Sequence, residues 1–169
     1  MAHKRTVMTR TTAPVHELQL RQFDLGLLSI RPVEGDDGKL LGSLLYCAYQ
    51  GTVDDEGQTL EESWTEGIEI LQGKYGLPIW PACFFAIGEE GNAVSCTIVT
   101  DEERHGPLLA FAATDPSYQK RGLAGRLISM SLDALRAVDV EKVALVVTDE
   151  NRSAISLYKR LGFVALELS

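Results

Sequence analysis

Apolar positions in the first half of the chain change from a short continuous run to spacings of three and four residues. The run over 25–30 predicts a strand that ends at Arg31-Pro32. The apolar residues that follow recur at helical spacing over 40–48 and again over 60–71, where Gly73 is suited to stop the second helix. The pattern therefore predicts one strand followed by two helices.

The second half begins with three apolar runs and then alternates between helix and strand. Gly91 and its polar neighbours, between the first two runs, are typical of a hairpin turn. The third run is apolar at almost every position, which predicts a strand covered on both faces. The predicted elements are strands over 83–87, 93–99 and 108–114, a helix over 122–136, a strand over 142–147, a helix over 151–160 and a strand over 163–168.

These elements follow the order β-α-α-β-β-β-α-β-α-β, in a single domain over residues 15–169. Consecutive strands favour antiparallel pairing, and the later helical crossover favours a parallel pair. The expected class is therefore α/β (α+β) with a mixed sheet flanked by helices. Residues 1–14 precede the first predicted strand and are expected to form a flexible tail.

Composition excludes several classes of partner. The 169 residues include 24 acidic and 16 basic side chains, a net charge of −8, so the chain lacks the basic field of a nucleic-acid binder. No run approaches the roughly 20 apolar residues of a membrane span. Cys47, Cys83 and Cys96 have no CxxC spacing and do not combine with histidines at metal-ligand spacing. We therefore expect reduced thiols in a cytoplasmic protein with no metal, nucleic-acid or membrane partner.

The stretch before the helix over 122–136 combines small and basic residues. Gly122 and Ala124 fall at the predicted helix start, where unpaired backbone N–H groups attract anions. Lys120, Arg121 and Arg126 add positive charge in an otherwise acidic chain. The alternative for the same pattern is a tight turn with nothing bound. The stretch lacks the glycine order of a dinucleotide fold and the Gly-Lys-Ser/Thr ending of a P-loop, which disfavours NAD and ATP.

Two motifs resemble the GNAT superfamily of acyl-CoA-dependent N-acyltransferases. The residues Gln119-Lys120-Arg121-Gly122-Leu123-Ala124 fit that family's pyrophosphate loop, Arg/Gln-x-x-Gly-x-Gly/Ala. The spacing Asn151-x-x-Ala154-x-x-x-Tyr158-x-x-x-Gly162-Phe163 is similar to its later helix. The resemblance covers roughly residues 83–166 and implies a GNAT-like, mostly antiparallel sheet. Many relatives place two strands where this chain offers one after Phe163, so an open sheet edge and a homodimer are expected.

The resemblance implies acetyl-CoA as co-substrate and no metal. Main-chain groups at the end of the strand over 108–114 would pair with the pantetheine arm, and the loop would hold the pyrophosphate. Asn151 would contact the cofactor arm, although a simple helix cap is the alternative for it. The implied cofactor-binding residues are Phe111, Ala112, Ala113, Thr114, Gln119, Lys120, Arg121, Gly122, Leu123, Ala124, Gly125, Arg126 and Asn151.

The resemblance also implies that Tyr158 is the general acid that protonates the departing thiolate. A phenol with an unperturbed pKa near 10 stays neutral at pH 7 and can donate that proton. The alternative for Tyr158 is a core aromatic on the buried face of its helix. The base is left open, because the strand over 108–114 holds no acid or histidine. Its candidates are Asp115, His105 or a water chain that leads to carboxylates elsewhere.

The first half of the chain is expected to select the acceptor. Ten acidic residues and one basic residue, Lys39, lie over 34–69. Asp54, Asp55 and Glu56 fall between the two predicted helices, where they would attract a cationic amine of a small molecule or peptide; a solvated acidic loop is the alternative. Trp80 is a further candidate for the acceptor side.

The hypothesis that joins these features is an N-acetyltransferase in which an amine attacks the thioester of acetyl-CoA directly. Catalysis would come from positioning the two reactants and from Tyr158 as acid. One alternative is a non-catalytic CoA-binding sensor or regulatory module of the same fold. A third interpretation is phosphate or nucleotide binding without acyl chemistry.

Overall fold

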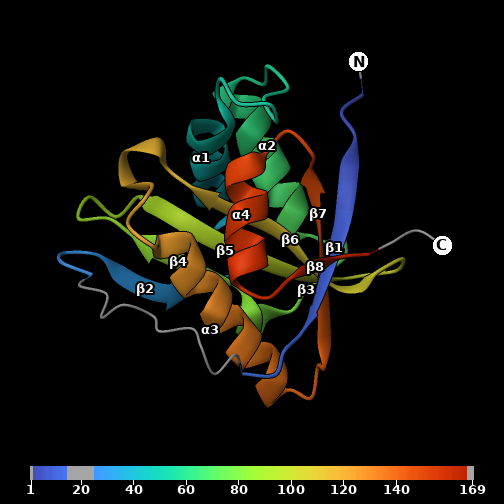
Figure 1. The fold of residues 1–169 in the computed structure, drawn as a ribbon. Helices are drawn as coiled ribbons and strands as arrows, with labels where there is room; N and C mark the ends of the chain where they lie inside the picture. Colours follow the sequence, from blue (N-terminus) through green and yellow to red (C-terminus); the bar gives the residue numbers. More distant parts are fainter. Residues whose placement is uncertain (1, 15–24, 167–169) are drawn as a thin grey trace.

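The computed structural model describes residues 2–14 and 25–166, and shows a twisted central sheet with helices on both faces (Figure 1). The strands are β1 (Arg5–Thr11), β2 (Ser29–Pro32), β3 (Leu77–Pro78), β4 (Phe84–Ile87), β5 (Ala93–Glu102), β6 (Gly106–Thr114), β7 (Lys142–Thr148) and β8 (Val164–Ala165). The helices are α1 (Gly38–Tyr49), α2 (Leu60–Leu71), α3 (Leu123–Ala137) and α4 (Arg152–Arg160), with short 3₁₀ turns η1 (Trp80–Ala82) and η2 (Pro116–Tyr118).

The strand order is β2-β4-β5-β6-β7-β1-β8, and β3 pairs with β5. Every pair among these strands is antiparallel except β6 with β7, which α3 joins as a parallel crossover. This arrangement confirms the predicted class and the order of the predicted elements, to which the structure adds β1 and β3. The first predicted strand is displaced, because its hydrogen bonds run over Ser29–Pro32 rather than 25–30.

The N-terminal segment corrects one expectation. Residues 1–14 were expected to be a flexible tail, but Arg5–Thr11 forms β1, which lies between β7 and β8 and is antiparallel to both. Met8 is 1% exposed, and the guanidinium of Arg10 donates to the carbonyls of Leu161 and Ala13. Because its pairing partner is more than a hundred residues away along the chain, the local pattern carried little sign of this strand.

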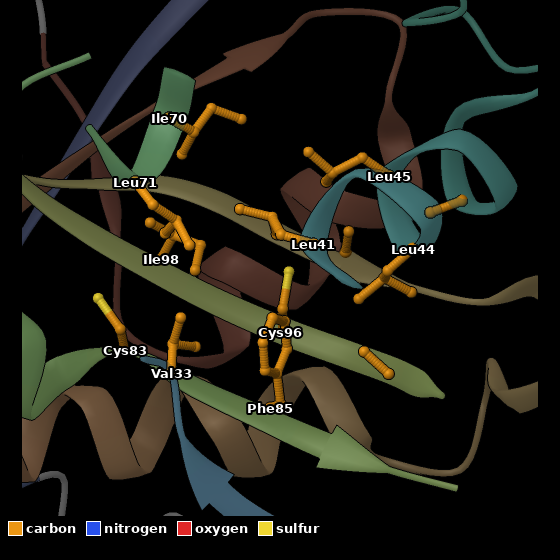
Figure 2. Packing of buried hydrophobic residues seen from close by; sticks show 13 residues of the cluster. Val33, Leu41, Leu44, Leu45, Ile70, Leu71, Cys83, Phe85, Cys96 and Ile98 are labelled. Atoms are coloured by element: carbon orange, nitrogen blue, oxygen red, sulfur yellow. The ribbon is translucent and has the colours of Figure 1, made fainter. Parts of the chain in front are cut away.

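The two faces of the sheet carry separate cores. Figure 2 shows the cluster under α1 and α2, in which leucines of α1 and α2 pack on Phe85, Cys96 and Ile98 of the sheet. The opposite face packs against α3 and α4 through a second cluster that includes Ile128 and Leu132. Alternate side chains of β5 therefore serve different cores, as the period of a strand requires.

The contact between α1 and α2 is close enough to fix the loop that joins them. A Cβ atom on Gly42 would lie 2.1 Å from the carbonyl oxygen of Ser63, so only glycine fits there. A capping box between Thr59 and Glu62 begins α2, with the Glu62 carboxylate accepting from the Thr59 N–H at 2.8 Å. Both ends of the loop over 50–59 are therefore held in place.

β6 and β7 separate after their paired segment. The parallel ladder contains the pair Leu108↔Ala144, and a register shift opposite Ile98 and Val99 adds one residue, Ala110, to β6. Beyond this bulge the two strands form opposite walls of a cavity. The prediction that the strand over 108–114 is covered on both faces is therefore wrong for its middle, because residues 110–112 are partly exposed to this cavity.

Candidate functional site

A cavity of about 570 Å³ lies between the ends of β6 and β7, α4, and the loop between α1 and α2. Leu108 to Ala112 line one side and Val146 to Thr148 the other. Of the predicted site residues, the cavity is lined by Phe111, Ala112, Asn151, Tyr158, Asp54, Asp55 and Glu56. Two elements far apart in the sequence, the α1–α2 loop and α4, therefore meet at one site.

Tyr158 packs in the core and also faces the cavity. Its ring packs edge-on against Phe163, with centroids 5.9 Å apart, so it belongs to the core under α4. It also lines the cavity, and no hydrogen-bond partner of its hydroxyl is found within 2–14 and 25–166. Burial, with the nearby charges of Asp54 and Cys96, raises its pKa to about 12. The phenol therefore keeps its proton throughout the neutral pH range.

Asn151 likewise serves as a cap and faces the cavity. Its Oδ1 accepts a hydrogen bond from the Ala154 N–H at 3.2 Å, which is the N-cap of α4. That bond turns the other end of the amide toward the cavity, where Nδ2 donates to Asp54 Oδ2 at 3.3 Å. The cap orients the group that the resemblance assigns to the cofactor arm.

The three acidic residues between α1 and α2 have different surroundings. Asp54 reaches across the cavity, and Thr148 donates to its Oδ1 at 2.8 Å. Asp55 accepts from the backbone N–H groups of Gly51 at 2.6 Å and Gly57 at 2.8 Å, and these bonds lower its pKa. Glu56 is exposed at the rim. Asp55 thus shapes the loop, whereas Asp54 and Glu56 present charge to the cavity.

Several lining residues were missed by the sequence analysis. Tyr49 lies at the end of α1, and its pKa is raised by burial and by the nearby Cys96, Tyr158 and Asp54. Its spacing of four from Leu45 was the available signal, because both side chains fall on the face that covers the sheet. Tyr75 packs edge-on against Phe111, with centroids 5.6 Å apart.

The local sequence pattern did not indicate that two charged residues, Glu66 and Arg5, line the cavity. Glu66 of α2 accepts from the Tyr75 hydroxyl at 2.8 Å and pairs with Lys74. Arg5 of β1 lines the cavity beside Thr148, its register partner. A second hollow adjoins the cavity along α2 and is lined by Glu56, Glu62, Glu66 and Glu69 among others. The acceptor side expected from the sequence is therefore strongly acidic.

Three other candidates lie outside the cavity. Trp80 is part of η1, which packs against α3, so the structure does not bring it to the acceptor side. His105 bonds to Glu102 in the turn before β6, with Nδ1 and Oε2 2.7 Å apart. Asp115 accepts from the Ser117 N–H at 2.8 Å and so caps η2. The His105 and Asp115 side chains are thus bonded within their own turns, and Trp80 is partly exposed away from the cavity.

The loop over 119–126 forms an open helix start. Lys120 and Gly122 both have positive φ angles, 61° and 80°, and Gly122 is the N-cap of α3 without a side-chain bond. The N–H of Arg126 is the first to bond within the helix, to the Gly122 carbonyl, so the N–H groups of 123–125 lie at its open end. This geometry suits a phosphate.

The side chains of this loop divide into two groups. Leu123 is 1% exposed and belongs to the core, so only its backbone is open to a ligand. Gln119, Lys120 and Arg126 are exposed. Arg121 lies over the Tyr118 ring at 4.9 Å and donates to the Ser117 carbonyl. The charged side chains at the start of α3 are therefore basic, as expected.

In the part of the chain that the structure describes, no helix is both long and apolar enough to cross a membrane. The same residues contain no group of three His, Cys, Asp or Glu side chains placed to hold a metal ion.

Comparisons with known proteins agree on one family. The sequence model of the acetyltransferase (GNAT) family matches residues 43–163. N-alpha-acetyltransferase 30 of Xenopus laevis is 28% identical over 145 residues, which cover 76% of this chain and 53% of that protein. The chain thus spans about half the length of that relative.

Solved structures show the same fold. A GCN5-related N-acetyltransferase from Sphaerobacter thermophilus superposes with a TM-score of 0.67 at 19% identity, covering 96% of this chain and 48% of that one. A GNAT family acetyltransferase from Brucella melitensis in complex with acetyl-CoA gives a TM-score of 0.60 at 18% identity, covering 84% of this chain and 88% of that one.

Proposed function

Because this chain belongs to the acetyltransferase (GNAT) family, we propose that it transfers an acetyl group from acetyl-CoA to the primary amine of a peptide or small molecule. The observation that carries the proposal is the cavity between β6 and β7. There the end of β6, beyond its pairing with β7, lies in the same lining as the protonated phenol of Tyr158. An acyl carrier and an amine can approach each other there from opposite ends.

The coenzyme is assigned to the α3 side of the cleft. The open N–H groups of 123–125 and the basic Lys120 and Arg126 suit its pyrophosphate. On the edge of β6 away from β5, main-chain groups of Phe111 to Thr114 would pair with the pantetheine arm as an added strand would. The relative from Brucella melitensis in complex with acetyl-CoA supports this choice of co-substrate.

Tyr158 is assigned the acid role. Acetyl-CoA supplies an activated acyl group, and transfer of that group leaves a thiolate that needs a proton. Because burial and the charge of Asp54 raise the Tyr158 pKa to about 12, its hydroxyl keeps its proton throughout the neutral pH range. The hydroxyl can therefore donate to the leaving sulfur.

The amine is assigned to the opposite, acidic end of the cavity. Asp54, Glu56 and Glu66 line that end and favour a cationic group. The name of the similar N-alpha-acetyltransferase supports the α-amine of a peptide as the acceptor. The acidic hollow along α2 leaves room for the residues of the acceptor peptide that follow its N-terminal residue.

The test combines binding and turnover. Purified protein is titrated calorimetrically with acetyl-CoA and then assayed for thiol release with a mixture of hexapeptides that have free N-termini, and with spermidine. We expect Tyr158→Phe to lower kcat by about 10² or more while the Kd for acetyl-CoA changes less than twofold. Unchanged turnover in Tyr158→Phe would remove Tyr158 from the acid role. Tight binding without thiol release from any amine would favour the non-catalytic sensor instead.

A further inference from the structure

One carboxylate enters the cavity from an otherwise exposed loop. Among residues 51–59, Asp54 alone is partly buried, and its side chain reaches the far wall. Thr148, at the end of β7, and Asn151, just before α4, both donate to it. The carboxylate is thereby held on the wall that also carries Tyr158.

These two bonds are not needed to shape the loop. Asp55 already binds the N–H groups of Gly51 and Gly57, and the Thr52 hydroxyl donates to the Tyr49 carbonyl at 2.7 Å. Both interactions are local, so they hold the turn whether or not Asp54 carries a charge. The bonds from Thr148 and Asn151 therefore fix the place of the Asp54 carboxylate itself.

The charge of Asp54 has no counter-ion among the residues that the structure describes. Both of its donors are neutral, and a carboxylate offers about four acceptor positions, so roughly two stay open. Arg5 also lines the cavity but forms no ion pair with Asp54 among the described residues, and a partly buried carboxylate without an ion pair favours binding a cation. The other base candidates, Asp115 and His105, lie outside this cavity.

We propose that Asp54 anchors the amino group of the acceptor beside Tyr158. The inference rests on the proposed function and names the residue that orients its nucleophile. Asp54 accepts a hydrogen bond from the ammonium, and one proton leaves the nitrogen through the carboxylate to solvent. The neutral amine then forms the C–N bond as the C–S bond breaks. Tyr158 gives its proton to the sulfur and regains one from the nitrogen, so amide, thiol and one solvent proton result.

The first test measures binding rather than turnover. A hexapeptide with a free N-terminus and its des-amino analogue are titrated into the protein saturated with CoA. We expect wild type to bind the free amine about tenfold or more tighter, and Asp54→Asn to bind both peptides equally. The Kd of acetyl-CoA should change less than twofold. Glu61→Gln, which removes the same charge from an exposed site on α2 outside both hollows, should keep the preference.

The second test separates the charge of Asp54 from its hydrogen bond to Thr148. Thr148→Val removes one bond but keeps the Asp54 charge, so the preference for the free amine should persist, reduced less than in Asp54→Asn. If the two variants lose the preference for the free amine equally, the effect belongs to the Thr148–Asp54 hydrogen bond and the proposal is overturned. An undiminished preference in Asp54→Asn would overturn it as well.

Turnover distinguishes this inference from the proposed function. For the free peptide, kcat/KM should fall about tenfold or more in Asp54→Asn, and added salt should lower kcat/KM less in this variant than in wild type. A wild type that acetylates neither the hexapeptides nor spermidine would overturn the proposed function, and this inference with it. An active wild type with an equally active Asp54→Asn overturns only the role of Asp54.

Discussion

Neighbouring residues of the same type serve different purposes in this protein. Asp54 and Asp55 are adjacent, yet one faces a cavity and the other binds two backbone N–H groups of its own loop. Asn151 caps a helix with its oxygen and faces the cavity with its nitrogen. At the scale of single residues, the direction of each polar atom therefore decides what the residue does.

Asp37 offers a residue-scale prediction with a defined pH dependence. Arg31 binds it through two nitrogens at 2.7 and 2.8 Å, and this hydrogen bonding holds the Asp37 pKa below its usual value. A carboxyl whose pKa is lower in the folded state stabilises the protein at pH values above its unfolded pKa, near 3.9. That stability is lost as the pH falls through the lowered folded value.

We expect Asp37→Asn to lower the free energy of unfolding by about 1 kcal/mol at pH 7. The difference from wild type should shrink as the pH falls below about 4, because wild type then loses the same charge. Urea unfolding at a series of pH values measures the loss of stability at pH 7 and its change with pH. Asp36→Asn, at an exposed neighbour, is the matched control and should have little effect. A difference that stays constant down to pH 2.5 would contradict the account.

Among the elements, β1 shows how pairing rather than composition makes a strand. Its partners β7 and β8 come from the other end of the chain, and Arg10 ties it to the end of α4 through the Leu161 carbonyl. Arg10 is 7% exposed, and its bond to the Leu161 carbonyl is buried.

Arg10→Ala is therefore expected to destabilise the protein by about 1–3 kcal/mol, since it leaves the buried Leu161 carbonyl without this donor. Lys4→Ala, whose side chain is 86% exposed and whose contact with Asp149 spans 3.9 Å, should cost less than about 0.5 kcal/mol. Chemical unfolding of both variants beside wild type makes the comparison. Equal, small effects would show that β1 contributes little to the folded state.

At the scale of the whole molecule, β1 fills the place that was expected to be an open edge. It covers β7, and the two-residue β8 follows it as a short edge. The Thr6 hydroxyl donates to Asp149 at 2.6 Å, so β1 also supports the turn that leads to Asn151. The first strand of the chain thereby braces the site.

β1 occupies the edge of β7, so two copies would not pair through that edge. β8 in turn pairs with β1 at Met8 and Thr9. We expect this chain to be a monomer of 18.5 kDa at micromolar concentration. Size-exclusion chromatography with light scattering measures the mass directly. A mass of twice that value would show that another surface, and not the edge of β7, joins two copies.

The sequence alone determined the elements whose signals are local. The periodicity over 60–71 placed α2, and the spacing from Asn151 to Phe163 placed α4 with its cap. The loop over 119–124 was singled out because small and basic residues fall at a predicted helix start and fit the GNAT pyrophosphate-loop pattern, and α3 does begin there. Side-chain period and backbone geometry act within a few residues, so the sequence shows them directly.

Tertiary structure decided which residues face one another across the cavity. The bond between Asp54 and Thr148 joins positions 94 residues apart, and no local pattern marks Asp54 rather than Asp55 as the one that turns inward. The exclusion of Trp80 and the inclusion of Tyr49 depend on which elements cover each face. β1 exists because β7 offers an unpaired edge. Burial and pairing are properties of distant segments brought together, so they follow only from the assembled fold.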